Sequence, residues 1–333
     1  MVNMTLPNLE ERLELLGDRI KNLANYYKIA DDVCPLEIAA RTRNFTEDEL
    51  CRLVSSAGAQ ALIRVPKPEL EEGLQVGHVD FLAALKTIKP RFGVQHEELE
   101  ELMPNGFIKY NQNSDLDNLL YVPGDGLSCQ LIEGDPKSGV STVAAQLALK
   151  SGFPFIKHIS VSDLYELSDS EKCRHILNVL EDAYISQRSA VILDGLERIL
   201  DYGALGMRYS NEILQMLMVI LKKQPPRGHA LLILCTTNRR DILQELGLLT
   251  VFTGEYHVPN LSTPDDIMAV MKALSRFEPE ELQSIGGAME GRHISIGIKR
   301  LLDLITWVNP LKPDRRPVKF LEKMGEIMGW TES

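Results

Sequence analysis

The sequence predicts an α/β protein in which a helix-covered parallel sheet follows a small all-α domain and leads into a helical lid. From about residue 127, short apolar runs alternate with helical patterns, which is typical of parallel strands buried on both faces. A glycine-bracketed loop follows the first of these runs and opens a helix. Helical spacing without strand candidates marks the two flanks. We therefore expect domains at 1–88, 127–262 and 263–333, with a linker at 89–126.

The composition is that of an ordinary soluble protein. Of 333 residues, 44% are hydrophobic and 25% are charged, which is enough apolar material for two folded domains. The net charge of -11 would repel a phosphate backbone, so we expect no nucleic-acid partner. The chain opens without an apolar signal segment, and no apolar run reaches the roughly 18 residues of a membrane-spanning helix. We expect a cytoplasmic protein without membrane insertion, whose five widely spaced cysteines are reduced thiols.

The N-terminal part predicts helices joined by short loops. Apolar residues recur at helical spacing between Leu9 and Leu23. Thr46 and Glu49 form a capping box, which predicts a helix that runs to about Arg64. Another helix is predicted at about 78–88, where Pro90 stops it. Residues 89–126 are rich in Pro, Gly, Asn and Asp and show no sustained period, which favours a linker.

The middle and end of the chain predict five strands and a helical tail. An amphipathic helix is expected from about Tyr209 to Lys222 and is assigned to the core, and a shorter helix is expected at 239–246. The strand candidates are the apolar runs at 127–133, 153–159, 189–194, 230–237 and 255–258. The tail helices are expected near 263–274, 278–288, 295–308 and 316–328.

The glycine-bracketed loop has the spacing of a phosphate-binding loop, G-x-x-x-x-G-K-[ST], except at its lysine. Backbone N–H groups and the following helix N-terminus bind the α- and β-phosphates in such loops. Valine stands where the lysine is expected. Taken alone, an ordinary helix start after a strand explains the pattern about equally well. The candidate binding residues are Gly134, Asp135, Pro136, Lys137, Ser138, Gly139, Val140, Ser141 and Thr142.

A second site lies sixty residues after Gly134, where the apolar run 190–193 ends in Asp194. P-loop enzymes place the carboxylate that holds Mg²⁺ at such a strand end. The next residue is normally an acid that activates water, but here it is Gly195, and Glu197 stands two positions further on. For Asp194 alone, a helix N-cap is the other reading.

Two further sites complete the pattern. Asn238 follows the strand 230–237. The polar end of this strand is expected beside the first two sites, on the carboxyl edge of the sheet. There Asn238 would orient a water molecule or contact a γ-phosphate, although capping the helix at 239–246 is an equally good reading. In the tail, Gly297 permits close approach at a helix start and Lys299 would reach back to a phosphate, although a helix lysine usually just faces solvent.

Taken together, these sites resemble the second ATPase domain of the N-ethylmaleimide-sensitive factor family, the vesicle-fusing AAA ATPases. The residues that carry the resemblance include SEKCRHILNVLEDAYISQ, RYSNEILQMLMVILKKQPPRG, TTNRRDILQE and IGIKRLLDLI. Upstream, RNFTEDELCRLVSSAGAQALIR resembles the helical lid that closes that family's first ATPase domain. The resemblance implies an AAA+ P-loop fold for 127–333 and the first domain's lid for 1–88.

The resemblance also implies roles for residues. Gly134, Gly139 and Ser141 match the Walker A loop, and Asp194 matches the Walker B acid, so Ser141 and Asp194 would hold Mg²⁺ beside ATP. Asn238 matches sensor 1, while Gly297 and Lys299 match sensor 2. Val140 and Gly195 depart from the pattern, and the segment GLLTVFTGEYHVP lacks the arginine pair that AAA enzymes use in trans.

In that family the second domain binds ATP and holds a hexamer together, and the whole assembly works in SNARE complex disassembly and vesicle-mediated transport. Contact with the SNAP adaptor and SNARE complexes would run through family parts that we expect to be absent here. Localisation on the cytoplasmic side of vesicle and Golgi membranes, as a peripheral protein, is likewise implied by the resemblance.

The departures lead us to expect a degenerate nucleotide-binding oligomerisation module. Losing the lysine removes roughly 1.5 to 3 kcal/mol of contact with the phosphates. A missing general base costs about 10²- to 10⁴-fold in rate, so little or no turnover is expected. The alternative is an active ATPase in which Lys137 replaces the lysine. A nucleotide kinase is disfavoured because no second Arg-rich lid insertion is present.

Overall fold

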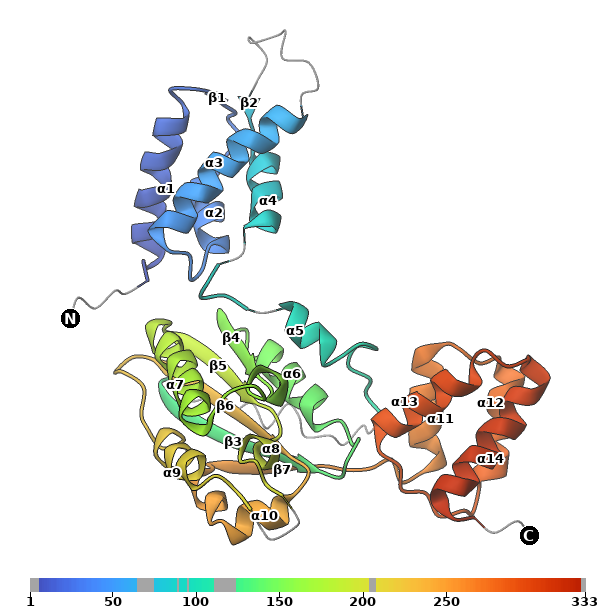
Figure 1. Ribbon diagram of the computed structural model, residues 1–333. Helices are drawn as coiled ribbons and strands as arrows, with labels where there is room; N and C mark the ends of the chain where they lie inside the picture. The colour runs from blue at the N-terminus through green and yellow to red at the C-terminus, as the bar shows by residue number, and fades with distance from the viewer. Residues whose placement is uncertain are drawn as a thin grey trace. The chain divides into compact units, whose positions relative to one another are not determined.

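The computed structural model describes residues 6–64, 75–88, 90–94, 96–110, 124–203 and 208–330. The chain divides into two compact units, each described here by itself (Figure 1). The first unit contains Met1–Val94 together with the short stretches Phe153–Ile156 and Val179–Ser189. The second unit contains Gln95–Gly152, Lys157–Asn178 and Ala190–Ser333, and it includes every candidate site residue.

The first unit is helical, as the sequence predicts, with a minimal sheet. Its elements are α1 (Leu9–Leu23), β1 (Lys28–Ile29), α2 (Pro35–Arg41), α3 (Glu47–Arg64), β2 (Gln75–Val76) and α4 (His78–Thr87). The predicted capping box is confirmed, since the Thr46 N–H donates to Glu49 Oε2 at 2.8 Å and the Glu49 N–H donates to Thr46 Oγ1 at 3.3 Å. Leu16, Leu50 and Phe81 lie at the centre of its core. The sequence pattern missed α2 and the parallel pair β1–β2.

Most of a five-stranded sheet, with the order β4-β5-β6-β3-β7, belongs to the second unit. β3 pairs in parallel with β6 on one side and with β7 on the other, and all eight residues of β6 are buried. The predicted strands are confirmed, each within two residues at either end. Their bounds are β3 (Gly126–Gly134), β4 (Phe155–Ile159), β5 (Arg188–Leu193), β6 (Ala230–Thr237) and β7 (Gly254–Val258).

Helices connect these strands, as parallel pairing requires. They are α6 (Val140–Lys150), α7 (Asp169–Ile185), α8 (Leu196–Ile199), α9 (Asn211–Ile220) and α10 (Arg240–Glu245). The predicted amphipathic helix is α9, and its apolar face is buried through Ile213, Leu217 and Ile220, which confirms its assignment to the core. In its described residues, the segment predicted as a linker contains the short helix α5 (His96–Glu101), while residues 89, 95 and 111–123 of that segment lie outside the described ranges.

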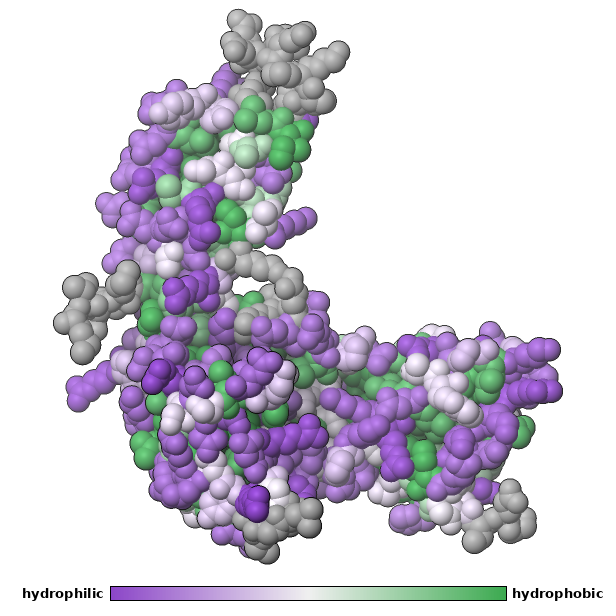
Figure 2. Space-filling model, viewed as in Figure 1, coloured by the Kyte–Doolittle hydropathy of each residue, from purple (hydrophilic) through white to green (hydrophobic). Residues whose placement is uncertain are grey.

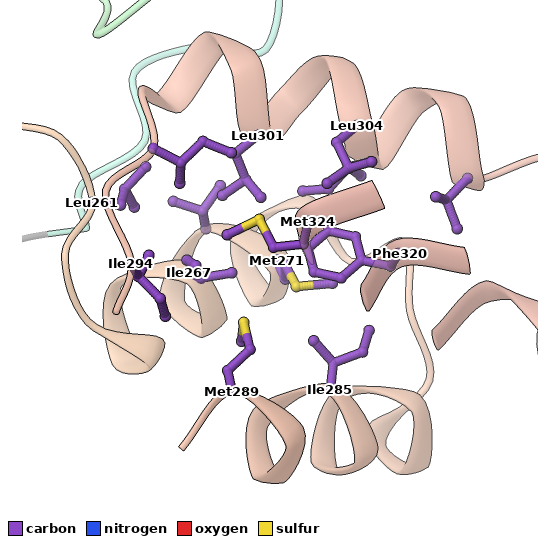
Figure 3. Close-up of a cluster of buried hydrophobic side chains, with 14 of the residues drawn as sticks. Leu261, Ile267, Met271, Ile285, Met289, Ile294, Leu301, Leu304, Phe320 and Met324 are labelled. Atoms are coloured by element: carbon purple, nitrogen blue, oxygen red, sulfur yellow. The ribbon is translucent and has the colours of Figure 1, made fainter. Parts of the chain in front are cut away.

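Four helices form the predicted tail: α11 (Pro264–Leu274), α12 (Pro279–Met289), α13 (Ile298–Val308) and α14 (Arg316–Met328). Their facing sides bury one apolar cluster, in which Phe320, Met324 and Met271 lie between α13 and α12 (Figure 3). α13 begins three residues later than predicted, because Ile296 pairs with Leu261 in an isolated bridge and Gly297 takes the N-cap position.

The exposed surface agrees with the sequence, in which charged residues make up 25%. The face seen in Figure 2 is mainly hydrophilic, although hydrophobic atoms gather near the ends of α3 and α4, where Leu62, Ile63 and Val79 are exposed. None of the helices in the described ranges combines the length and the apolar character that crossing a bilayer demands. All five cysteines are free thiols, and Cys129, Cys173 and Cys235 are buried.

Candidate functional site

The phosphate loop begins at the end of β3 with Gly134, where the surrounding atoms leave no room for a side chain. A Cβ on Gly134 would lie 2.6 Å from Ser138 Oγ and 2.9 Å from the Val258 carbonyl oxygen, so only glycine fits. At the other end, Gly139 has φ +97°, a left-handed conformation that L side chains rarely adopt. It caps α6 without any side-chain hydrogen bond to the first turn. The first N–H groups of α6 are therefore available to an anion, as in phosphate-binding loops.

Asp194 lies at the end of β5 and meets residues from three other elements. Thr236 Oγ1 of β6 donates to Asp194 Oδ1 at 2.6 Å and accepts the Gly195 N–H at 2.8 Å. Burial pushes the pKa of Asp194 up, but the neighbouring His158, together with hydrogen bonds from Thr236 and Ser141, holds it below its ordinary value. The carboxylate is thus ionised next to the Ser141 hydroxyl, and these two oxygen donors suit Mg²⁺.

The position after Asp194 cannot supply a base. Gly195 has φ +76° and caps α8, so Asp194 itself is not the helix N-cap. Glu197 is buried, and its carboxylate accepts Thr237 Oγ1 at 2.7 Å and the Asn238 N–H at 3.4 Å. This carboxylate therefore holds the end of β6.

Asn238 lies against the phosphate loop. With its carboxamide oriented to match its neighbours, the nitrogen donates to the carbonyls of Gly134 and Asp135, each at 3.2 Å. The helix that follows is capped by Arg239, so the capping role weighed for Asn238 is wrong. The sequence prediction that β3 and β6 bring their polar ends together is confirmed by these contacts.

The start of α13 packs directly on the same loop. A Cβ on Gly297 would lie 2.6 Å from the Lys137 carbonyl oxygen, which confirms that glycine permits this approach. The Lys299 N–H donates to that same oxygen at 2.9 Å, and Lys137 Nζ pairs with Asp303 Oδ2 at 2.7 Å. Asn260 adds a bond from Nδ2 to Asp135 Oδ2 at 2.8 Å. The lid and the loop are therefore joined by direct protein contacts.

A pocket of about 380 Å³ opens beside the loop, within the size range of small-molecule sites. Its lining combines loop and lid residues with segment 101–110, including Ser138, Gly139, Thr142, Lys299 and Asp303. Thr142 Oγ1 donates to the Leu102 carbonyl at 2.8 Å, and Tyr110 Oη donates to the Pro259 carbonyl at 3.1 Å. Ser138 Oγ is buried and has no hydrogen-bond partner among the described residues. These features fit a nucleotide whose phosphates lie on α6.

Two residues of the loop bear on the lysine that the phosphate-loop pattern expects. Val140 is only 5% exposed and its side chain packs toward Gly134, so an apolar group occupies the lysine position. Lys137, the alternative cation of the loop, pairs with Asp303 of α13. The sequence pattern missed segment 101–110, Thr236 and His158, because their roles depend on tertiary neighbours rather than on any motif.

Comparison with known proteins agrees with this geometry. Residues 130–259 match the model of the ATPase family associated with various cellular activities (AAA), and residues 260–327 match the NSF, AAA+ ATPase lid domain. The chain is 34% identical to the vesicular-fusion protein SEC18 of Saccharomyces cerevisiae, over 97% of this chain and 45% of that protein. It is 33% identical to the vesicle-fusing ATPase of Caenorhabditis elegans, over 97% of this chain and 42% of that protein.

The vesicle-fusing ATPase of Arabidopsis thaliana is also 33% identical, over 91% of this chain and 42% of that protein. The chain thus spans less than half the length of these relatives. The AAA match and the lid match adjoin at residues 259 and 260, where β7 gives way to the helical tail. On these matches and the fold together, the chain belongs to the AAA ATPases, in the family of the vesicle-fusing ATPases.

Proposed function

We propose that this chain is a nucleotide-binding AAA module that helps to hold a ring-shaped oligomer, a hexamer by resemblance, and turns over little or no ATP. The proposal rests on a difference between the backbone and the side chains of the same site. The backbone of the phosphate loop has the glycines and the open helix N-terminus of a binding loop, while Val140 and Gly195 replace the side chains that act on the γ-phosphate.

The described residues offer ATP and Mg²⁺ the following groups. The first turn of α6 binds the phosphates, and Ser141 with Asp194 holds Mg²⁺. Mg²⁺, when bound, neutralises phosphate charge. Lys299 supplies a cation from the lid, because its backbone is fixed to the loop and its side chain lines the pocket. Asn238 already bonds the loop carbonyls, and we assign it the positioning of the loop.

The place of the module in the cell follows from its relatives. They are named vesicular-fusion proteins or vesicle-fusing ATPases. We assign this chain to the same process, SNARE complex disassembly in vesicle-mediated transport, on the cytoplasmic side of vesicle and Golgi membranes. Contact with the SNAP adaptor and with SNARE complexes is assigned to family regions outside the aligned part.

Two measurements on one preparation test the proposal. Calorimetry with ATP and Mg²⁺ is expected to show binding, and a steady-state phosphate-release assay is expected to stay at background. Asp194→Asn serves as the control, because any true turnover at this site disappears in it. Turnover like that of an intact AAA domain, abolished by Asp194→Asn, contradicts the degenerate assignment. Absence of ATP binding in the calorimeter contradicts the nucleotide-binding assignment.

A further inference from the structure

A histidine lies beside Asp194, which holds the metal ion in the proposed function. It belongs to a strand in which the sequence shows no functional motif. His158 belongs to β4, and its side chain is 9% exposed. Its Nε2 atom is 3.9 Å from Asp194 Oδ2 and has no hydrogen-bond partner among the described residues. A buried polar atom without a partner costs about 1 to 3 kcal/mol, so such an atom points to something that the protein alone does not supply.

The carboxylate beside this nitrogen is itself hydrogen-bonded to another potential metal donor. Ser141 bonds Asp194 as well, so an imidazole, a carboxylate and a hydroxyl meet from β4, β5 and α6. Two ligand atoms about 2.1 Å from one ion lie roughly 3.0 to 3.4 Å apart. The present 3.9 Å exceeds that spacing by roughly 0.5 to 0.9 Å, so the proposal requires the two side chains to approach each other when the ion binds. No group of three His, Cys, Asp or Glu ligands occurs among the described residues, so the hydroxyl and solvent or phosphate oxygens must complete the shell.

We propose that His158 is a third metal ligand, so that this site prefers a divalent transition-metal ion to Mg²⁺. Mg²⁺ takes oxygen ligands and is reluctant to lose its waters, whereas imidazole nitrogen suits first-row transition ions. Replacing an oxygen ligand by nitrogen therefore changes which ion is favoured. The proposal rests on the Asp194 metal place assigned above, but it requires no nucleotide.

An acidic residue stands near the same ring. Burial raises the pKa of Glu98, and the charge of His158 acts against that rise, so Glu98 of α5 lies within electrostatic reach of the imidazole. Carboxylates commonly orient metal-binding histidines from outside the ligand shell.

The test uses Mn²⁺ as a spectroscopic probe on the whole chain without nucleotide. The electron paramagnetic resonance signal of free Mn²⁺ falls on binding, which gives its dissociation constant. We expect Mn²⁺ to bind at least tenfold more tightly than Mg²⁺ in competition, and Zn²⁺ to displace it. Spin-echo modulation from a coordinated imidazole nitrogen is expected in the bound spectrum.

His158→Leu is expected to raise the Mn²⁺ dissociation constant at least tenfold, to leave that of Mg²⁺ unchanged and to remove the nitrogen modulation. If this variant does not fold, His158→Gln provides the same comparison, because its amide oxygen returns the preference toward Mg²⁺. His257→Gln is the matched control, since His257 also pairs with a carboxylate, Glu133, at 2.8 Å but is 60% exposed. It is expected to change none of these values.

The proposal is overturned by equal Mn²⁺ and Mg²⁺ affinities, by an Mn²⁺ affinity that does not depend on His158, or by a bound spectrum without nitrogen modulation. Failure of the metal-ligand proposal can be distinguished from failure of the proposed function. ATP binding measured in a chelating buffer reports the phosphate loop alone, and Mn²⁺ binding measured without ATP reports the histidine site alone.

Discussion

At the scale of single residues, Val140 decides what the phosphate loop offers a nucleotide. It begins α6 and is buried, so its side chain presents methyl groups where a lysine would present a charge. The backbone N–H groups beside it keep their direction, because Gly134 and Gly139 fix the course of the loop. Phosphate binding by the loop depends on backbone N–H groups, whereas neutralisation of the phosphate charge depends on the side chain at position 140. A change at this position is therefore expected to affect the two differently.

Val140→Lys is expected to tighten ATP binding by about one to two powers of ten, because it restores a charge-assisted contact with the phosphates. Turnover is expected to stay near background, because Gly195 still lacks a carboxylate. Calorimetry and phosphate release measure the two effects. Val140→Met is the control, being long but uncharged, and it should leave affinity unchanged. An unchanged affinity in the lysine variant would show that the loop is only a helix start.

Tyr110 gives a second residue-scale prediction. Burial raises its pKa to about 12 from 10.0, and its hydroxyl bonds the Pro259 carbonyl. A pKa raised by folding stabilises the protein below the unfolded value, and that contribution is lost as pH rises from 10.0 toward about 12. Because Tyr110 is only partly buried, we expect a loss on the order of 1 kcal/mol.

Denaturant unfolding at pH 9 and pH 11.5 measures this effect. Tyr110→Phe is expected to reduce the fall in stability between these two values, while Tyr26→Phe, at an 82% exposed position, is expected to leave it unchanged. An equal fall in the wild type and in Tyr110→Phe would contradict the assignment to Tyr110.

At the scale of elements, the strands were predictable and several short helices were not. The runs that became β3 and β6 are continuous and apolar because both faces of a parallel sheet are buried. α5 escaped detection because its HEELEE sequence has a single apolar residue and therefore no period. α2 is short, and Cys34 at its N-cap makes no side-chain capping bond. β1 and β2 are two residues long and pair across a long stretch of sequence, which leaves no local signal.

The residues of the candidate site likewise include some that the sequence predicted and some that it did not. The loop, Asp194, Asn238 and Gly297 were predicted because each occupies a fixed place relative to a strand end or helix start. His158 sits inside the apolar run 153–159 and looks like any strand residue until β5 places Asp194 next to it. Asp303 gave no signal either, since its partner Lys137 lies 166 residues earlier.

The junction of α13 with the phosphate loop gives an element-scale prediction. Gly297→Ala places a Cβ 2.6 Å from the Lys137 carbonyl, so the lid or the loop must shift. We expect a destabilisation of about 1 to 3 kcal/mol, as for overpacked sites. Gly287→Ala in α12 is the matched control, because nothing lies within 4 Å of its added Cβ.

Gly287→Ala is expected to stabilise the protein by about 0.5 to 1 kcal/mol, because alanine is the better helix former. Urea unfolding of both variants measures the difference. If Gly297→Ala is as stable as the wild type, the contact between α13 and the loop is not maintained in solution.

At the scale of the whole molecule, assembly must depend on protein contacts if the nucleotide is bound weakly. α9 uses its apolar face inside the unit, so it is unavailable as an interface through Ile213, Leu217 or Ile220. The start of α13 is the better candidate, because Lys299 lines the pocket and Arg300 is exposed beside it. A contact made by such cations is weakened by salt.

We therefore expect an oligomer that depends on protein concentration, dissociates at high ionic strength and is only modestly tightened by ATP. Sedimentation velocity over a hundredfold concentration range, at low and high salt, measures each of these properties. Arg300→Glu is expected to weaken the oligomer, while Arg292→Glu, also exposed in the lid, serves as the control for net charge. A monomer at every concentration, with and without ATP, would remove the oligomerisation function.

The position of β3 in the sheet also sets when the site is able to form. Both neighbours of β3, the strands β6 and β7, begin roughly a hundred residues later in the chain, so its pairing requires a long loop closure. On the ribosome, the phosphate loop therefore emerges well before the strands that hold its base. We therefore expect this module to fold late in synthesis, and a nucleotide that binds the loop would stabilise it only after β7 has paired with β3.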